Sequence, residues 1–229
     1  MSRLASCVAL AVLLLGSGAC RTAPSRLDRN GDGVVRVVCL GDSNSALGDP
    51  RVGDTWCEYL AARFPDWQFV NQGKGFARAT GDTMLWGKAL LQHVWRAAPD
   101  VLFIALGTND LVAARQSPET AVAALLDFRA EAQRRNIEVA IATVPPALQQ
   151  SPELQANIAA ANRLLAAALP ADRLIDFTSG LSEADFLPDG IHVNSRGQRK
   201  RADAAAATVH ALGGVERGPF PLPRGAATP

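Results

Sequence analysis

Five short runs of apolar, often β-branched residues alternate along this chain with longer segments of helical periodicity, and this alternation constrains the fold more than any other feature. Strands are expected over residues 34–40, 67–70, 101–106, 137–143 and 173–177. Helices are expected over residues 55–64, 82–97, 117–135, 151–168 and 195–212. Such alternation forms right-handed βαβ units, which build a parallel sheet covered by helices on both faces. The chain is therefore predicted to form one three-layer α/β/α domain with a five-stranded parallel sheet, over residues 34–213.

Residues 1–20 are predicted to be a signal peptide that precedes this domain. Arg3 is followed by an apolar run from about Val8 to Leu15, which is too short to be a stable membrane anchor, and then by small residues. The segment Ser17-Gly18-Ala19 suits ordinary signal peptidase, but together with Cys20 it also resembles a bacterial lipobox, in which the cysteine is lipidated. We therefore expect an exported protein, either periplasmic, secreted, or anchored to a membrane through Cys20.

Two polar segments flank the predicted domain. Residues 21–33 are interpreted as a tether, and its end, Asp28-Arg29-Asn30-Gly31-Asp32-Gly33, is similar to the start of a calcium-binding loop. Cys39 stands where that loop needs a bidentate carboxylate, so the string is interpreted as a turn into the first strand. Residues 214–229 are rich in Pro and Gly and are predicted to be a disordered tail.

Charge and cysteine content exclude several classes of function. The chain carries 23 basic and 22 acidic residues, a net charge of +1, which favours neither nucleic acid nor an anionic membrane surface as a partner. Cys39 and Cys57 could meet between the first strand and the following helix, either as a disulfide or, the interpretation we favour, as buried free thiols. No Cys/His spacing is typical of a metal site.

Polar residues follow the predicted strands at the points where the strands end. Ser43 follows the first strand, a glycine-rich loop over residues 71–83 the second, Asn109 the third, and Asp189 and His192 the fifth. The carboxyl ends of parallel strands meet at one edge of a sheet, so these side chains can share a cleft. Attack by a serine needs a base, a group that orients the base, and donors for the oxyanion, and this edge supplies each.

Three motifs resemble a known family. Gly41-Asp42-Ser43, Gly107-Thr108-Asn109-Asp110 and Asp189-Gly190-Ile191-His192 are similar to blocks I, III and V of the SGNH hydrolases, also called GDSL esterases and lipases, in the same order. The resemblance implies a flavodoxin-like fold, no metal and no organic cofactor. It also implies that Ser43 is the nucleophile, His192 the general base and Asp189 the residue that orients His192. Asn109, the N–H of Ser43 and a block II glycine would then bind the oxyanion.

Block II is less clearly defined in this sequence. The preferred oxyanion glycine is Gly81, in Thr80-Gly81-Asp82-Thr83. Gly75 lies nearer to the distance from Asn71 that is usual in the family, so the choice between these two glycines stays open. Gly73 is interpreted as a turn glycine. Block I departs from the family in having Asn44 where leucine is frequent.

The sequence thus predicts an exported serine esterase that removes short acyl or O-acetyl groups from carbohydrate or lipid esters, acting as a monomer on small-molecule or polysaccharide substrates. The acyl group and the alcohol are left open. Two alternatives remain: a non-catalytic carbohydrate- or surface-binding domain on the same scaffold, and an acyltransferase that uses the same Ser43.

Overall fold

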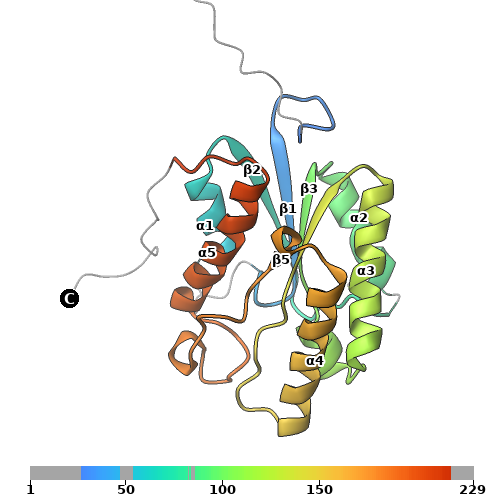
Figure 1. Ribbon diagram of the computed structural model, residues 1–229, viewed down its shortest axis with the longest axis vertical. Helices are drawn as coiled ribbons and strands as arrows, with labels where there is room; N and C mark the ends of the chain where they lie inside the picture. The colour runs from blue at the N-terminus through green and yellow to red at the C-terminus, as the bar shows by residue number, and fades with distance from the viewer. Residues whose placement is uncertain (1–26, 47–53, 82, 84–85, 218–229) are drawn as a thin grey trace, which may run out of the picture.

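A five-stranded parallel sheet in the order β2-β1-β3-β4-β5 forms the centre of the protein, as seen in a computed structural model that describes residues 27–46, 54–81, 83 and 86–217 (Figure 1). The strands are β1 (Val35–Gly41), β2 (Trp67–Gly73), β3 (Val101–Ala105), β4 (Glu138–Ala142) and β5 (Leu174–Ile175). The α-helices are α1 (Trp56–Arg63), α2 (Gly87–Arg96), α3 (Pro118–Arg134), α4 (Pro152–Ala168) and α5 (Ser195–Ala211). Short helical turns are η1 (Asn109–Ala113), η2 (Ala171–Arg173) and η3 (Glu183–Asp185). The predicted α/β fold is confirmed.

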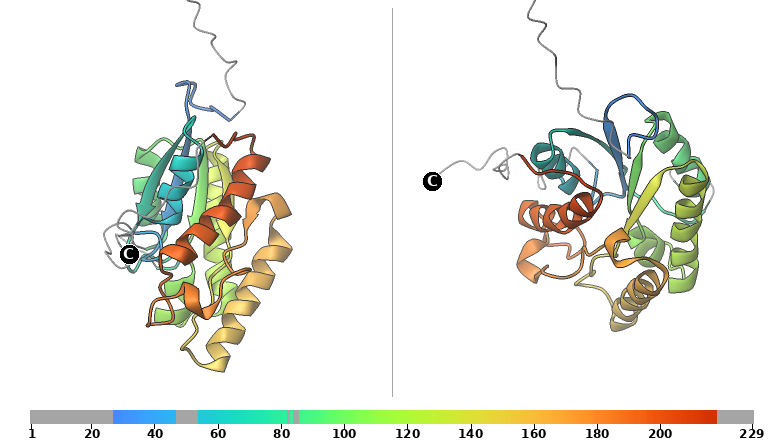
Figure 2. Two further views of the ribbon diagram at one scale, coloured as in Figure 1. Left: turned by 90° about the vertical axis from the view of Figure 1, so that its left-hand side faces the viewer. Right: turned by 45° about the horizontal axis from the view of Figure 1, so that its top comes forward.

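Helices cover both faces of the sheet, with α1 and α5 on one side and α2, α3 and α4 on the other (Figures 1 and 2). Because successive strand residues point to opposite faces, the central strands must be apolar throughout. The buried side chains that face α2, α3 and α4 include Val38, Leu40, Leu102 and Ile104. Those that face α1 and α5 include Val37, Cys39, Val101 and Phe103. The strand order changes direction between β1 and β3, which places the segment after β1 at the point where such sheets bind ligands.

Side-chain caps place three helices where the sequence predicts them. Thr55 and Glu58 form the predicted capping box of α1. Ser117 and Ser151 each accept the backbone N–H of the third residue after them, and a proline follows each serine at the first helical position.

The fifth strand is shorter than the predicted range of 173–177. Only Leu174 and Ile175 pair with β4. The carboxylate of Asp176 then accepts the N–H groups of Thr178 and Ser179, each at 2.9 Å, and turns the chain away from the sheet. The prediction was wrong here because a side chain competes with the strand for backbone hydrogen bonds.

The second strand is longer than predicted and the second α-helix begins later. β2 continues to Gly73 because residues 71–73 pair with residues 39–41 of β1. α2 begins at Gly87 and not near residue 82. The reason is that Arg78 forms an isolated β-bridge with Trp86, and the Arg78 carbonyl accepts the Gly87 N–H at 3.1 Å. Asp82 lies outside the described residues.

Residues 27–33, the end of the predicted tether, form the expected turn into β1. Asp28 accepts the N–H groups of Asp32 and Gly33, and the Asp32 carboxylate pairs with Arg36 at 2.9 Å. The carboxylates of the segment that is similar to a calcium-binding loop are therefore hydrogen-bonded to other groups of the protein.

Residues 1–20, with Cys20, lie outside the described residues. Within the described ranges, no helix has the length and apolar composition needed to cross a bilayer.

The first residues of the predicted tail pack against the domain. Glu216 pairs with Arg63 of α1 at 2.9 Å, and the Arg217 N–H donates to the Arg63 carbonyl at 3.0 Å. Residues 214–217 are therefore bonded to the domain, which corrects the prediction that disorder begins at residue 214.

Cys39 of β1 and Cys57 of α1 are both buried and both free. Burial, together with the neighbouring Cys57 thiol, raises the pKa of the Cys39 thiol well above its ordinary value. A thiol with a raised pKa forms little thiolate near neutral pH and is poorly reactive. The favoured prediction of buried free thiols agrees with this arrangement.

The loop before α5 is attached to that helix by the buried carboxylate of Asp185. Its oxygens pair with Arg196 at 2.5 Å and with Lys200 at 2.7 Å, and they also accept the N–H and hydroxyl of Ser182. Burial by itself would raise the pKa of Asp185, but the bonds from Lys200, Ser182 and Arg196 outweigh it and hold this pKa well below its usual value.

We predict that Asp185→Asn lowers the free energy of unfolding near neutral pH and that this loss becomes smaller in acid. An aspartate whose pKa is depressed in the folded state stabilises it above the unfolded pKa of about 3.9, and this stabilisation is lost as the pH falls further. Urea unfolding of both proteins, from neutral pH to about pH 3, measures the difference. Asp66→Asn, which breaks an exposed ion pair with Arg217, is the control and should change little. A difference between Asp185→Asn and wild type that does not vary with pH would contradict the prediction.

Candidate active site

Ser43, His192 and Asp189 form a continuous chain of hydrogen bonds at the carboxyl edge of the sheet. The Ser43 Oγ lies 2.9 Å from Nε2 of His192, and Nδ1 of the same ring lies 2.8 Å from Oδ2 of Asp189. Ser43 lies in a loop after β1 (residues 42–46, the Ser43 loop). The other two lie in the turn before α5 (residues 187–193, the His192 turn). The structure thus brings Ser43 to His192, which lies 149 positions away in the sequence, and to the neighbouring Asp189.

The carboxylate of Asp189 holds both the ring and the backbone of His192. Its Oδ1 accepts the N–H groups of His192 and Ile191, at 2.8 and 3.0 Å, while Oδ2 binds the ring. Burial opposes ionisation of Asp189, but these N–H groups and the His192 ring outweigh it, so the pKa of Asp189 is lowered. The carboxylate is therefore ionised at neutral pH, and it orients the ring so that Nε2 faces Ser43.

The Ser43 loop is tightly packed on the ends of β1 and β2. A Cβ added at Gly41 would lie 2.1 Å from the Ser45 Oγ, and one added at Gly73 would lie 2.3 Å from the Ser45 carbonyl carbon. The buried Trp56 donates its indole N–H to the Ser45 Oγ at 2.9 Å. Gly73 was predicted to be a turn glycine, which was wrong, because it ends β2 and leaves room for the Ser43 loop.

Asn109 and Asp110 tie the segment after β3 to the segment after β2. The Asn109 amide donates to the Ala77 carbonyl at 3.1 Å. The buried Asp110 accepts the N–H groups of Ala79 and Thr80, at 3.1 and 2.8 Å, and the Thr80 hydroxyl at 2.6 Å. Asp110 is therefore an acceptor that fixes this loop, whereas Asn109 keeps a second amide N–H for another acceptor.

The two candidate glycines of block II occupy different surroundings. Gly75 lies two residues before Ala77, and a Cβ at Gly75 would meet no atom within 4 Å. Gly81 has a φ of +90°, and a Cβ there would meet the Trp86 side chain at 3.4 Å. Among the described residues, no hydrogen bond joins Gly81 to Ser43 or Asn109. Ala77, which binds Asn109, lies two residues after Gly75, and Thr80, which binds Asp110, lies next to Gly81, so these contacts do not decide between the two glycines.

Two buried ionisable side chains, Asp42 of the Ser43 loop and Arg201 of α5, interact at this loop. Burial raises the pKa of Asp42, although the N–H of Asn44 and the charge of Arg201 oppose the rise. Burial lowers the pKa of Arg201 to about 10, against the pull of Asp42. The Asn44 carbonyl accepts hydrogen bonds from Arg201 at 2.8 Å and from Gln198 at 2.9 Å. The sequence analysis did not predict Gln198 or Arg201, although their spacing of three residues places both on one side of α5.

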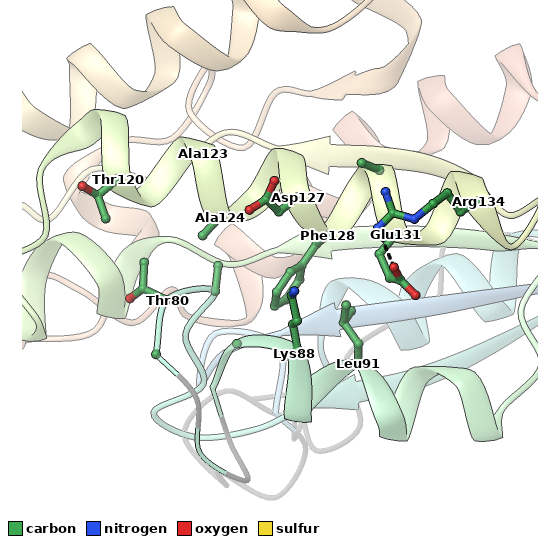
Figure 3. A pocket seen from close by; sticks show the side chains of 14 residues that line it. Thr80, Lys88, Leu91, Thr120, Ala123, Ala124, Asp127, Phe128, Glu131 and Arg134 are labelled. Atoms are coloured by element: carbon green, nitrogen blue, oxygen red, sulfur yellow. Dashed lines mark hydrogen bonds and ion pairs between the residues drawn. The ribbon is translucent and has the colours of Figure 1, made fainter.

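The triad is open to solvent. The side chains of His192 and Asp189 are 28% and 37% exposed, and Ser43 is half-buried. A groove of about 700 Å³ runs between α2 and α3, with Leu91 and Phe128 on its floor (Figure 3). None of its lining residues belongs to the triad.

Among the described residues, no group of His, Cys, Asp and Glu side chains is arranged to hold a metal.

Comparisons with known proteins agree with this geometry. A family model described as the GDSL-like lipase/acylhydrolase family matches residues 39–200, which is more than half of the chain. A comparison with curated protein sequences finds no match.

Solved structures share the fold at low sequence identity. A member of the lipolytic protein G-D-S-L family from Veillonella parvula is 22% identical with a TM-score of 0.62, over 75% of this chain and 96% of that one. A carbohydrate acetylesterase family member from Sinorhizobium meliloti is 21% identical with a TM-score of 0.62, over 77% and 98%. The aryl esterase of M. smegmatis is 20% identical with a TM-score of 0.61, over 77% and 99%.

Proposed function

The chain belongs to the GDSL-like lipase/acylhydrolase family and is an ester hydrolase, and we propose that it cleaves carboxylic esters through an acyl-enzyme on Ser43. The observation that carries this proposal is the hydrogen-bonded chain from Ser43 Oγ through His192 to Asp189, with distances of 2.9 and 2.8 Å. These are the distances that proton transfer from a nucleophile to a base requires.

The proposed cycle follows from the positions of the protons. With Nδ1–H donated to the ionised Asp189, Nε2 of His192 is free to accept the hydroxyl proton as Ser43 Oγ attacks the acyl carbon. Asp189 stabilises the imidazolium that forms, and this imidazolium then protonates the leaving alcohol. Water enters, loses a proton to Nε2, and hydrolyses the acyl-enzyme by the same steps in reverse.

The oxyanion would be bound by the Ser43 N–H and the free N–H of the Asn109 amide. Among the described residues, the Ser43 N–H has no hydrogen-bond partner, so it can donate to a substrate. The third donor stays open between Gly75, two residues before the Ala77 that binds Asn109, and Gly81, next to the Thr80 that binds Asp110.

We propose that the natural substrate carries a small acyl group, such as acetyl, on a larger alcohol. The triad is open to solvent, and neither the groove between α2 and α3 nor the hollow lined by Leu148, Phe186 and Leu187 includes Ser43 among its lining residues. An open site of this kind accommodates a bulky alcohol such as a polysaccharide but provides little apolar surface for a long acyl chain. The likeness in fold to a carbohydrate acetylesterase family member is in keeping with this substrate class.

We predict that Ser43→Ala and His192→Ala each abolish hydrolysis of p-nitrophenyl acetate, because either loss prevents activation of the nucleophile. The double variant should be little worse than either single variant, since the residues act as a unit. Asp189→Asn should leave equal or greater activity, because it only misorients the ring.

Folded protein must be verified by melting temperature for each of these variants. His93→Ala is the matched control, since His93 lies on α2 and, within the part of the chain that the structure describes, has no hydrogen bond to the triad. It should retain wild-type turnover. A folded Ser43→Ala protein with near-native turnover would refute the proposed function.

Asn109→Ala tests the oxyanion role. The amide would act where charge develops in the transition state, so kcat should fall by roughly 10²–10³, about 2.7–4 kcal/mol, with KM much less affected. Loss of the bond to Ala77 should also lower the melting temperature. If kcat per folded molecule stays at the wild-type value while the melting temperature drops, Asn109 only shapes the loop.

We propose in addition that the protein is exported and loses its first residues, because residues 1–20 have the composition of a signal peptide. Intact-mass measurement on protein from a bacterial host should give a mass that lacks the segment before Cys20. A diacylglycerol adduct on Cys20 would identify a lipoprotein, an acyl-free new N-terminus would identify ordinary cleavage, and an uncleaved chain would contradict export.

A further inference from the structure

The side chain of Asn44 binds the backbone on both sides of His192. Its Oδ1 accepts the N–H of Val193 at 3.0 Å, and its Nδ2 donates to the carbonyl of Ile191 at 3.3 Å. These atoms belong to the two peptide groups that flank His192. Asn44 is itself only 3% exposed, so water does not readily replace it. The residue next to Ser43 thus holds the segment that carries the proposed base.

Asn44 is also fixed at its own backbone. Its N–H donates to the Asp42 carboxylate at 2.9 Å, and its carbonyl accepts bonds from Gln198 and Arg201, which are buried residues of α5. Every polar group of Asn44 therefore has a partner. A side chain held in this way cannot rotate without breaking several buried hydrogen bonds.

The bonds of Asn44 are the link between two segments that come from distant parts of the chain. Among the described residues, the only other hydrogen bond between the Ser43 loop and the His192 turn is the one from Ser43 to His192 itself. The remaining bonds of His192 run within its own turn: its N–H binds Asp189, and its carbonyl accepts the Leu187 N–H at 2.7 Å. The internal bonds shape the turn, and Asn44 sets its position relative to Ser43.

We propose that Asn44 is a positioning residue that sets the distance between Ser43 Oγ and His192 Nε2, a role that rests on the proposed function of this pair. A primary amide can donate to a carbonyl and accept from an N–H at the same time. Leucine, aspartate and alanine at this position cannot do both. Without the amide, two peptide groups lose their partners, the His192 turn shifts, and the 2.9 Å bond to Ser43 lengthens.

The test is Asn44→Leu, assayed for kcat and KM with p-nitrophenyl acetate together with melting temperature. A misplacement of about 1 Å costs up to about 10²-fold in rate, so kcat should fall by roughly 10- to 100-fold while KM changes little. If Asn44→Leu does not fold, Asn44→Ala replaces it, because water can then enter and bind the exposed peptide groups. The same fall in kcat is expected.

Asn162→Leu is the matched control. The Asn162 side chain binds the two peptide groups that flank Val144, accepting the Val144 N–H at 2.8 Å and donating to the Val144 carbonyl at 2.9 Å, and among the described residues it has no hydrogen bond to the triad. Its loss should lower the melting temperature by a similar amount and leave kcat close to wild type.

A second measurement separates positioning from general destabilisation. In a His192→Ala background, Asn44→Leu should cause no further loss of the residual rate, because there is no base left to position. An equal loss with and without His192, or wild-type kcat in folded Asn44→Leu, would overturn the proposal. These outcomes test the role of Asn44 only if hydrolysis by the wild-type protein depends on Ser43. A wild-type protein without Ser43-dependent hydrolysis would instead refute the proposed function.

Discussion

A buried positive charge supports the loop on which the proposed chemistry depends. The Arg201 guanidinium is 2% exposed, lies 4.2 Å from the centre of the Phe177 ring, and donates to the Asn44 carbonyl. Its pKa of about 10 keeps it protonated at neutral pH, and the charge of Asp42 opposes the lowering of this pKa by burial. A buried charge is tolerated only when neighbouring groups pair with it and accept its hydrogen bonds. The position of the Ser43 loop is therefore determined by electrostatics as well as by packing.

The same helix also supports the other half of the site. One side of α5 directs Gln198 and Arg201 at the Ser43 loop, and another directs Arg196 and Lys200 at Asp185, in the loop that leads to the His192 turn. The Asn44 amide then joins the two segments directly. α5 thus supports both the loop of the proposed nucleophile, from the start of the domain, and the turn of the proposed base, from its end.

Much of this arrangement could be predicted from the sequence, because it depends on residue types at strand ends. The convergence of Ser43, Asp189 and His192 follows from parallel strands alone. The role of Asn44 could not be predicted, because it depends on where a side chain points. Arg201 follows Arg199 and Lys200, and such a basic run is typical of a solvated helix face. Only its packing against Phe177 and the Ser43 loop reveals that it is buried.

Ser43 and His192, which share a hydrogen bond, are separated by 149 positions in the chain. Contacts of such long sequence separation form only after most of the intervening chain is in place, and they slow folding. A ribosome releases the serine long before the histidine, so a nascent or truncated chain holds a serine without its base. Esterase activity would therefore report that folding is complete, and a chain cut anywhere between these residues and separated into its two parts would be inert even if each part kept its helices.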